Sequence, residues 1–395
     1  MRTPDRTYLR THPFISFRLN MAGAGPKLWI LLGEAQSKCR HISGAPLLPA
    51  VQTTFRQVNL AKGVLATTAI EGNTLSEAEV RARLEGTLSL PPSKEYLGQE
   101  VDNIVRAINF VGREVLTGNA PSLTPELVKT YNRMILEGLP LDPEVRPGAC
   151  RTYQVGVGRY RPVEAQDCEY LLERFCNWLN SDWSADVGEL RDHGVVLGVL
   201  KAVAAHLYLA WIHPFGDGNG RTARLIEFQL LLSAQVPDVA AHLLSNHYND
   251  TRAEYYLRLN ESSRGEGDPL PFIRYAVQGF VDSLRQQIEV VRDQQLAVHW
   301  QNFIYDEIDG HTSAATRRRH LLLDLPADRH TPITQIARLT PRLAAAYARK
   351  TTKTVRRDVN WLIEVDLVRE VGDSVVPRIE RMAAFLPRTY DPISA

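Results

Sequence analysis

The apolar residues of this chain recur mainly at helical spacing, and the longest such pattern lies on both sides of a short polar segment. Apolar positions run from Val195 to Ile212 and resume from Leu225 to Leu232, which predicts two buried helices separated by a loop. Thr124 followed by Pro125 is typical of a helix start, because threonine caps the first turn and proline suits its first position. These patterns predict a helical block around the polar segment.

An earlier helix is predicted by residues that share one helical face, namely Phe55, Val58, Ala61 and Leu65. Gly72 is a suitable residue to end this helix. Glu71 then lies at the negative end of the helix dipole, which is an unfavourable place for a carboxylate without a cation nearby. The run from Ser76 to Glu79 has the pattern of a capping box, so it predicts that another helix begins there.

Residues 151–162 show the alternation of a strand rather than the spacing of a helix. Tyr153, Val155 and Val157 alternate with smaller or polar residues, and the glycines and proline of the segment suit a turn. The sequence therefore predicts a β-hairpin, which on this pattern alone is an ordinary surface hairpin.

The last block, residues 312–395, differs from the rest in charge and in pattern. It holds 15 lysines and arginines against 9 acidic residues, a formal charge of +6, whereas the remainder carries −5. Helical patterns are predicted at 317–325, 333–347 and 351–367, and the Gly372-Asp373 pair between valines is a hairpin turn signal. Three helices followed by a short hairpin resemble a winged helix-turn-helix.

The composition limits the class of protein. With 395 residues, of which 44% are hydrophobic, the chain can bury a sizeable core and form two or three domains. The formal net charge of +1 gives no sign that the chain as a whole binds nucleic acid. The four cysteines lack zinc-type spacing and a disulfide-rich context, so free thiols in a reducing compartment are expected. We see no secretory signal and no apolar run of membrane-spanning length, and expect a cytoplasmic protein without membrane contact.

The polar segment from His213 to Arg224 carries most of the chemistry. Pro214 biases His213 away from helical dihedral angles, so the preceding helix should end there. The glycines at 216, 218 and 220 permit close backbone approach, and a helix that restarts near Asn219 points its N–H groups at the same place. Arg221 and Arg224 lie three residues apart, so both can reach the oxygens of one phosphate group.

Three further side chains complete the segment. Asp217 is placed where a carboxylate can hold a magnesium ion that bridges phosphates, and His213 is the group able to take a proton near neutral pH. Phe215 has no polar task and is expected to anchor the loop in the core. The segment is not a P-loop, which needs Lys-Ser/Thr after the last glycine, and no strand precedes it as in a Rossmann fingerprint. It predicts a phosphate-binding site with a general base.

The segment resembles the signature of the Fic family, His-x-Phe-x-Asp/Glu-Gly-Asn-Gly-Arg-x-x-Arg, and every defined position is met. Fic enzymes are all-α proteins, most of which transfer AMP from ATP to a hydroxyl side chain of another protein. The resemblance implies a mainly α, Fic-type helical core with a short β-hairpin flap. It implies that His213 deprotonates the target hydroxyl and that Asp217 holds Mg²⁺. The residues implied to cradle or clamp the ATP phosphates are Gly218, Asn219, Gly220, Arg221 and Arg224.

Residues 67–73 resemble the Ser/Thr-x-x-x-Glu-Gly/Asn inhibitory motif of Fic proteins. In that motif the glutamate pairs with the second arginine of the loop and blocks productive binding of ATP. Carried over, Glu71 pairs with Arg224, and the chain resembles the Fic proteins that have their own N-terminal inhibitory helix. Without the resemblance, Glu71 is simply an exposed residue at a helix end.

Two looser resemblances add candidate contacts. Residues 151–162 are similar to the Fic flap, which aligns the main chain of the target by strand addition. The run from Arg252 to Tyr256 is similar to an Arg-x-x-Tyr-Tyr run whose tyrosines lie against the nucleoside. Many relatives have an asparagine seven residues after the second tyrosine, where this chain has Ser263. The contacts to ATP implied in this way are Val157, Gly158, Arg159, Tyr160, Tyr255 and Tyr256.

The predicted domains are an N-terminal helical region (1–118), a Fic catalytic domain (119–288), a helical connector (289–311) and a winged helix-turn-helix-like module (312–395). The exposed face of the recognition helix would hold Lys353, Arg356 and Arg357. A winged helix is used to bind DNA, to dock another protein or to close a homodimer, and the sequence leaves these uses open.

The function expected from the sequence is transfer of AMP from ATP to a serine, threonine or tyrosine of a protein target, with Glu71 holding the activity off. This expectation includes transfer of AMP to the chain itself. The alternatives are a DNA- or partner-binding regulator whose Fic loop has low activity, and a Fic enzyme that mainly removes AMP or uses another phosphate donor.

Overall fold

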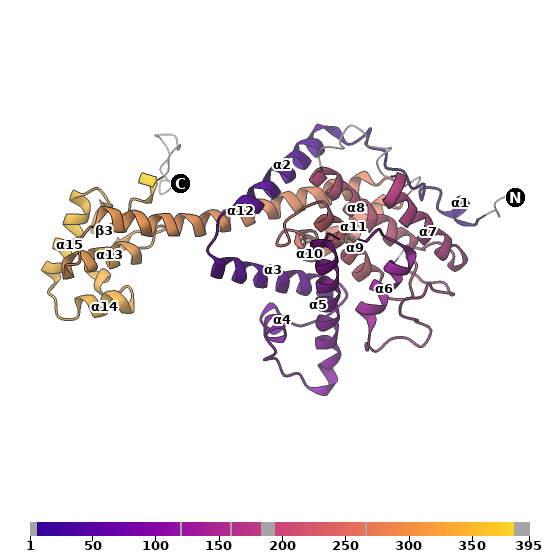
Figure 1. Cartoon of the computed structure of the whole chain (residues 1–395), viewed down its shortest axis with the longest axis horizontal. Helices are drawn as coiled ribbons and strands as arrows, with labels where there is room; N and C mark the ends of the chain where they lie inside the picture. The colour runs from indigo at the N-terminus through magenta and orange to yellow at the C-terminus, as the bar shows by residue number, and fades with distance from the viewer. Residues whose placement is uncertain (1–5, 119–120, 159, 183–193, 265–266, 383–395) are drawn as a thin grey trace. The chain divides into compact units, whose positions relative to one another are not determined.

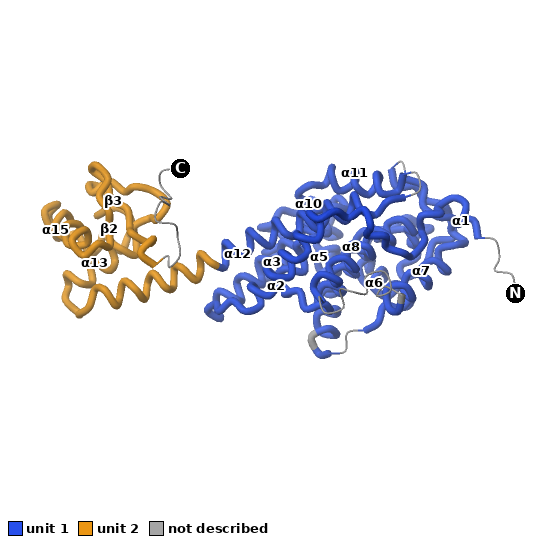
Figure 2. The backbone as a smooth tube through the Cα atoms, turned by 90° about the horizontal axis from the view of Figure 1, so that it is seen from above, with its two compact units in different colours: residues 1–291 blue, residues 292–395 orange. Residues whose placement is uncertain are grey.

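The computed structural model describes residues 6–118, 121–158, 160–182, 194–264 and 267–382. The chain divides into two compact units, residues 1–291 and 292–395 (Figure 2). Both units are built mainly from helices, and the sheet of the described residues has three short strands (Figure 1). The predicted mainly α fold class is therefore confirmed.

The helices of the first unit follow one another along the chain, and a long connection, residues 137–167, joins α6 to α7. They are α1 (Tyr8–Thr11), α2 (Gly25–Gly44), α3 (Pro49–Ala69), α4 (Glu77–Leu84), α5 (Glu95–Leu116), α6 (Pro125–Leu136), α7 (Cys168–Asn177), α8 (Gly194–Ile212), α9 (Asn219–Ser233), α10 (Leu243–Asp250), α11 (Arg252–Ser262) and α12 (Leu270–Glu307), which ends in the second unit.

The predicted helix starts are present. Ser76 accepts a hydrogen bond from the backbone N–H of Glu79, and the side chain of Glu79 accepts one in return, so α4 opens with the predicted capping box. Thr124 caps α6 by accepting from the N–H of Leu127, and proline occupies the first helical position. Local sequence signals therefore set these boundaries.

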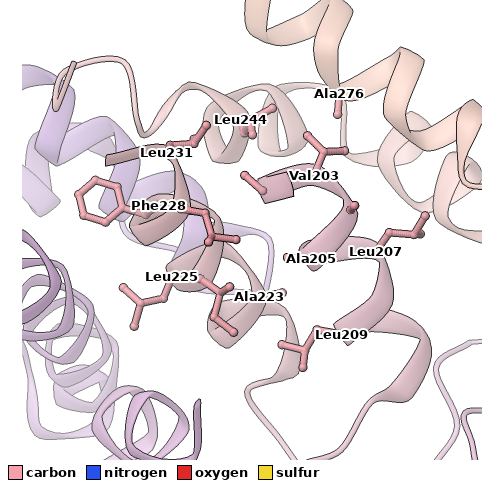
Figure 3. Close-up of a cluster of buried hydrophobic side chains, with 14 of the residues drawn as sticks. Val203, Ala205, Leu207, Leu209, Ala223, Leu225, Phe228, Leu231, Leu244 and Ala276 are labelled. Atoms are coloured by element: carbon pink, nitrogen blue, oxygen red, sulfur yellow. The ribbon is translucent and has the colours of Figure 1, made fainter. Parts of the chain in front are cut away.

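Helices α8 and α9 form the centre of the first unit. They pack against each other, with α2 and α7 beside α8, and α3, α5 and α6 beside α9. Figure 3 shows the apolar side chains that meet here, among them Val203, Ala205, Leu207 and Leu209 of α8 and Ala223, Leu225, Phe228 and Leu231 of α9. The loop between the two helices is consequently held by the best-packed part of the unit.

The expectation that the chain holds no apolar run of membrane-spanning length is wrong for α8. This helix has 19 residues and a mean hydropathy of 1.9, so by length and composition it could cross a membrane. In the folded chain 78% of the segment is buried, because other helices cover α8 on several sides. Its apolar character is therefore explained by its central place in a helical core.

The second unit has a small core of its own. Its elements are β1 (Thr331–Pro332), a short 3₁₀ helix (Ile333–Arg338), α13 (Ser313–Asp324), α14 (Pro341–Tyr347), α15 (Thr352–Glu364), β2 (Val368–Val371) and β3 (Ser374–Pro377). The strands run antiparallel in the order β1-β3-β2, and the predicted turn at Gly372 joins β2 to β3. Trp300 and Ile304 near the end of α12, and Ile308 just after it, belong to this core.

Two expectations for this unit need correction. The single helix predicted at 333–347 is divided into a 3₁₀ turn and α14, because Thr340 caps a new helix at Pro341, a residue that has no N–H to continue the earlier one. Strand β1 was not predicted, since two residues leave no alternation in the sequence. All four cysteines are free, as expected.

The close packing of α8 on α9 predicts a difference between two glycines. A methyl group at Gly198 would overlap the side chain of Ala234, whereas one at Gly33, on the exposed face of α2, would meet nothing within 4 Å. Gly198→Ala should lower the free energy of unfolding by about 1–3 kcal/mol, and the control Gly33→Ala should raise it by about 0.5–1 kcal/mol. Urea unfolding of both variants measures this difference, and equal stabilisation of both would contradict the packing described.

Candidate active site

The polar segment forms a tight turn between α8 and α9. Helix α8 ends at Ile212, as the following proline predicts, and His213 takes a left-handed conformation with φ +50°, which is uncommon for a residue with a side chain. Phe215 is 1% exposed and anchors the loop in the core, as expected. Gly218, at φ +76°, is the N-cap of α9 and has the left-handed conformation that favours glycine.

Asn219 closes this turn with its side chain. Its Oδ1 accepts from the N–H of Phe215 at 3.0 Å, and its Nδ2 donates to the carbonyl of Phe215 at 2.9 Å. Both ends of the amide are thus used within the loop. Any contact of Asn219 with a phosphate would therefore come from its backbone N–H, in the first turn of α9.

Two buried residues that the sequence analysis missed hold the loop from outside. The guanidinium of Arg151 donates to the carbonyls of His213, Tyr153 and Val163, and its backbone N–H donates to the carbonyl of Pro214. Asn132 of α6 donates to the carbonyl of Asp217 at 2.9 Å. Asn132 belongs to no local motif, and Arg151 opens the segment 151–162 but has its partners outside any motif pattern, so the single sequence did not indicate these roles.

Arg221 joins the loop to α5. Its Nη1 donates to Glu100 at 2.6 Å, and its Nη2 donates to Oδ1 of Asp217 at 3.0 Å. The second oxygen of Glu100 accepts from Asn73 at 2.8 Å. Burial raises the pKa of Glu100 above its usual range, although the charge of Arg221 opposes this shift.

Arg224 joins the loop to α3. Its side chain is 2% exposed and donates to the hydroxyl and the carbonyl of Thr67, at 2.7 and 3.0 Å. Its Nη2 also donates to Oε1 of Glu71 at 2.5 Å, which is the pairing that the sequence predicts. Burial raises the pKa of Glu71, but the charges of Arg224 and Arg221 outweigh it, so this pKa lies below its usual value and the carboxylate stays ionised.

The contact between Glu71 and Arg224 depends on Gly220. A Cβ atom at Gly220 would overlap Oε1 of Glu71 and would lie 3.1 Å from Nη1 of Arg224. Nη1 of Arg224 and Nε of Arg221 are buried and lack a hydrogen-bond partner among the described residues. The missing side chain at Gly220 therefore leaves a cradle where buried N–H donors could meet an anion.

A cavity of about 540 Å³ lies beside this cradle and brings the four sequence motifs together. The predicted residues that line it are Glu71, Val157, Gly158, Tyr160, His213, Asn219, Gly220, Tyr255 and Tyr256. Ser263 lines it as well. Arg159 lies outside the described residues. A cavity of this volume is in the range that accommodates a nucleotide-sized ligand.

The flap segment is a shorter hairpin than the alternation predicts. Among the described residues its pairing is an isolated antiparallel bridge, in which Val157 and Tyr160 each donate a backbone N–H to the other's carbonyl at 3.0 Å. The carbonyl of Tyr153, further from the turn, accepts from the guanidinium of Arg151. Tyr160 donates its hydroxyl to the carbonyl of Trp211 at 2.8 Å, which fixes the turn over the end of α8.

The run from Arg252 to Tyr256 opens α11 and faces the end of α3. Arg252 donates to the carbonyls of Ala69 and Ile70, the last carbonyls of the helix that precedes Glu71. Tyr255 is buried and hydrogen-bonded to His206, whereas Tyr256 is exposed at the cavity. The arginine therefore supports the end of α3 just before Glu71, a role that the sequence did not indicate.

His213 is neutral at physiological pH. Burial lowers its pKa to about 4, with a further decrease from the charge of Arg151, while the negative charge of Glu71 opposes the shift. A group with this pKa is unprotonated at pH 7 and is ready to accept a proton. It lines the cavity, where a reacting hydroxyl could reach it.

The described residues contain no group of three or more histidine, cysteine or acidic side chains that could hold a metal ion by themselves. Asp217 of the same loop offers a carboxylate that is 43% exposed and pairs with Arg221. Mg²⁺ is commonly held by one or two carboxylates together with water and substrate phosphates. Asp217 fits this kind of site.

Comparisons with known proteins match the region that contains the loop between α8 and α9. Residues 122–231 match the model of the Fic/DOC family. Protein adenylyltransferase fic-1 of Caenorhabditis elegans is 31% identical over 229 residues, and the match covers 58% of this chain and 41% of that protein. Protein adenylyltransferase Fic of Nematostella vectensis is 29% identical over 210 residues, covering 53% of this chain and 44% of that protein. The chain thus spans less than half the length of these curated relatives.

The fold is similar to that of solved Fic structures. Fic-1 from C. elegans superimposes with a TM-score of 0.53 and 26% identity, over 67% of this chain and 73% of that chain. A Fic family protein from Desulfovibrio desulfuricans G20 matches with a TM-score of 0.53 at 20% identity, over 89% of this chain and 96% of that chain. The second likeness concerns the fold alone.

The environment of His213 predicts a pKa change of definite sign. Because the carboxylate of Glu71 stabilises the protonated imidazole, Glu71→Gln should lower the pKa of His213 further below its value of about 4. A pH titration of the histidine ring protons by NMR measures this shift, with His213→Gln identifying the signal. A pKa that rises in Glu71→Gln would show that the carboxylate does not act on this ring.

Proposed function

We propose that this chain, whose residues 122–231 form a Fic domain, transfers AMP from ATP to a serine, threonine or tyrosine hydroxyl of a protein target. The proposal rests on one observation above the others. Segments far apart in the sequence, around residues 71, 157, 213 and 255, line a single cavity that also contains a neutral histidine. Relatives of about 30% identity carry the name protein adenylyltransferase.

The chemistry requires a base, phosphate binding and an oriented hydroxyl. The target oxygen forms a bond to the α-phosphorus of ATP while the bond from that phosphorus to the bridging oxygen breaks, and pyrophosphate leaves. The proton of the hydroxyl goes to the ring of His213, which is unprotonated at pH 7. Arg221, Arg224 and the N–H groups at the start of α9 position the phosphates.

Asp217 would hold the magnesium ion, which neutralises phosphate charge when bound. Its Oδ1 is already fixed by Arg221 and by the N–H of Gly218, so the carboxylate is oriented before any ligand arrives. The buried N–H groups of Arg221 and Arg224 that lack protein partners among the described residues are suited to phosphate oxygens.

Glu71 is proposed to inhibit this reaction. Its carboxylate occupies the space beside Gly220 and binds Nη2 of Arg224, both of which the phosphates would use. A phosphate group misplaced by about 1 Å can lose on the order of a hundredfold in rate. Removal of the carboxylate frees the cradle and leaves the bonds of Arg224 to Thr67 in place.

A second proposal concerns residues 312–382, whose helices and antiparallel strands have the order of a winged helix. Lys353 and Arg357 are exposed on α15, and Arg356 is exposed but pairs with Glu370 at 2.8 Å. We propose duplex DNA as the partner of this face, with protein docking and homodimer formation as the competing uses. Removal of AMP and use of another phosphate donor remain alternatives for the first unit.

The inhibition proposal predicts activation by one substitution. Glu71→Gly should raise AMP incorporation, including self-modification, at least about tenfold, because the phosphates can then bind in line for attack. Glu71→Asp should release less, since a shorter acid still reaches Arg224 in part. Intact mass of the full chain with ATP and Mg²⁺ measures the gain.

Two controls separate regulation from catalysis. Glu71→Gly combined with His213→Ala should bind ATP but incorporate no AMP, because the base is missing. Arg224→Ala should not imitate Glu71→Gly, because it also removes a phosphate ligand. Equal incorporation by wild type and Glu71→Gly would refute the inhibition, whereas incorporation by the His213→Ala variant would refute the assigned base.

The DNA proposal predicts a strong dependence on salt. Each phosphate contact of Lys353 or Arg357 that is removed by substitution with glutamine should reduce the slope of log affinity against log salt by about 1. Arg356→Gln should have a smaller effect because Glu370 already pairs with this guanidinium. Binding of duplex DNA by the full chain at several salt concentrations tests this, and no binding at low salt would favour docking of a protein.

A further inference from the structure

A second and larger cavity of the first unit, of about 1090 Å³, lies outside the candidate active site. One wall is formed by residues 56, 57, 59 and 60 of α3, and another by residues of α5 from 102 to 113. Phe228 and Leu232 of α9 and His242 close it. None of the residues that line the nucleotide-sized cavity lines this one.

The cavity touches both helices that carry the inhibitory contact. Helix α3 leads to Glu71, and α9 carries Arg224 one turn before Phe228. Because α3 supplies a whole wall, the cavity in this form exists only while α3 lies against α5 and α9. Whatever fills the cavity therefore binds the arrangement in which Glu71 holds Arg224.

Its lining combines an apolar floor with a positively charged edge. The floor consists of Leu60, Val105, Ile108, Phe228, Leu232 and Val239. The lining holds four arginines, of which Arg56 pairs with Asp238 at 2.9 Å and Arg83 pairs with Asp102 at 2.7 Å. Arg106 and Arg113 lie seven residues apart on one face of α5, and both are exposed. The pair of Arg106 with Glu137 is solvent-exposed, so it competes weakly with an anion.

His242 supplies a buried polar group in the same cavity. His242 is 8% exposed and stacks on Phe228 with the ring centroids 4.6 Å apart. Burial lowers its pKa to about 4, so the neutral ring has one N–H to donate and one nitrogen to accept. A ligand that enters the cavity therefore meets a ring that can both donate and accept a hydrogen bond.

We propose that this cavity is a regulatory site for a small amphipathic anion, with an apolar body against the floor and a carboxylate, sulfonate or phosphate near Arg106 and Arg113. Such a ligand binds the state with α3 docked, and so opposes any movement of α3 that would withdraw Glu71 from Arg224. The bound ligand inhibits transfer of AMP. Productively bound ATP weakens the affinity of the cavity for this ligand by the same factor by which the ligand weakens productive binding of ATP. The direction of this effect rests on the proposed function, whereas the binding site does not.

The test uses anilinonaphthalene sulfonate, a fluorescent apolar anion, and phenylnaphthylamine, the same ring system without the charge. Gly112 lines the cavity, and a Cβ there would meet nothing within 4 Å, so Gly112→Phe fills the space without a clash at the backbone. Gly33→Phe is the matched control, because Gly33 is also helical and has equally open surroundings on α2. All variants are full-length chains whose helical circular dichroism and Tm are measured alongside.

Gly112→Phe should weaken binding of the sulfonate by about fivefold or more, and Gly33→Phe should leave it unchanged. Arg106→Gln with Arg113→Gln should weaken binding of the sulfonate but not of the neutral amine. A saturating amount of the sulfonate should lower AMP incorporation by wild type and not by Glu71→Gly.

Undiminished binding of the sulfonate to Gly112→Phe would overturn the site. Competitive displacement of the sulfonate by ATP from Glu71→Gly would also overturn it, because the probe would then occupy the nucleotide cavity. Equal loss of the amine and the sulfonate in the arginine variant would overturn the proposed anion. If neither wild type nor Glu71→Gly incorporates AMP, the proposed function fails, while the fluorescence result still decides the binding site.

Discussion

The buried guanidinium of Arg224 is the constraint on which the candidate site depends. A charge that is 2% exposed needs partners inside the protein, because leaving it unpaired would cost several kcal/mol. Thr67 and Glu71 supply them, and both belong to the end of α3 and the turn after it. The position of α3 is therefore tied to the catalytic loop, and the shape of both cavities follows from this tie.

The same principle organises the rest of the loop. Arg221 is balanced by Glu100 and Asp217, and Asn73 connects Glu100 back to the turn that holds Glu71. Arg151 satisfies three carbonyl groups around His213. Asn219 is paired within the loop, and Arg221 and Arg224 are paired with residues of other segments, so much of the loop is ordered before a ligand binds.

Local signals allowed much of this structure to be predicted from the sequence. The ends of α8 and α9, the cap at Ser76, the place of Phe215 and the pair of Glu71 with Arg224 follow from residues close in sequence or from one specific motif. Arg151, Asn132 and Glu100 could not be predicted, because their roles arise from contacts between segments distant in the chain. The flap was predicted as a hairpin because its alternation is that of a strand, and among the described residues this pairing is limited to the bridge of Val157 with Tyr160.

The two bonds from Arg224 to Thr67 have a consequence for inherited variation in this chain. They hold α3 to α9 without help from Glu71. The fold therefore depends on the bonds to Thr67, whereas the proposed restraint on activity depends on Glu71. Many substitutions can destroy activity by loosening the core, but one at position 71 is enough to remove the proposed restraint from an otherwise intact molecule. Selection against an unregulated enzyme then acts on a single exposed glutamate, whereas selection for a folded one acts on the whole helical core.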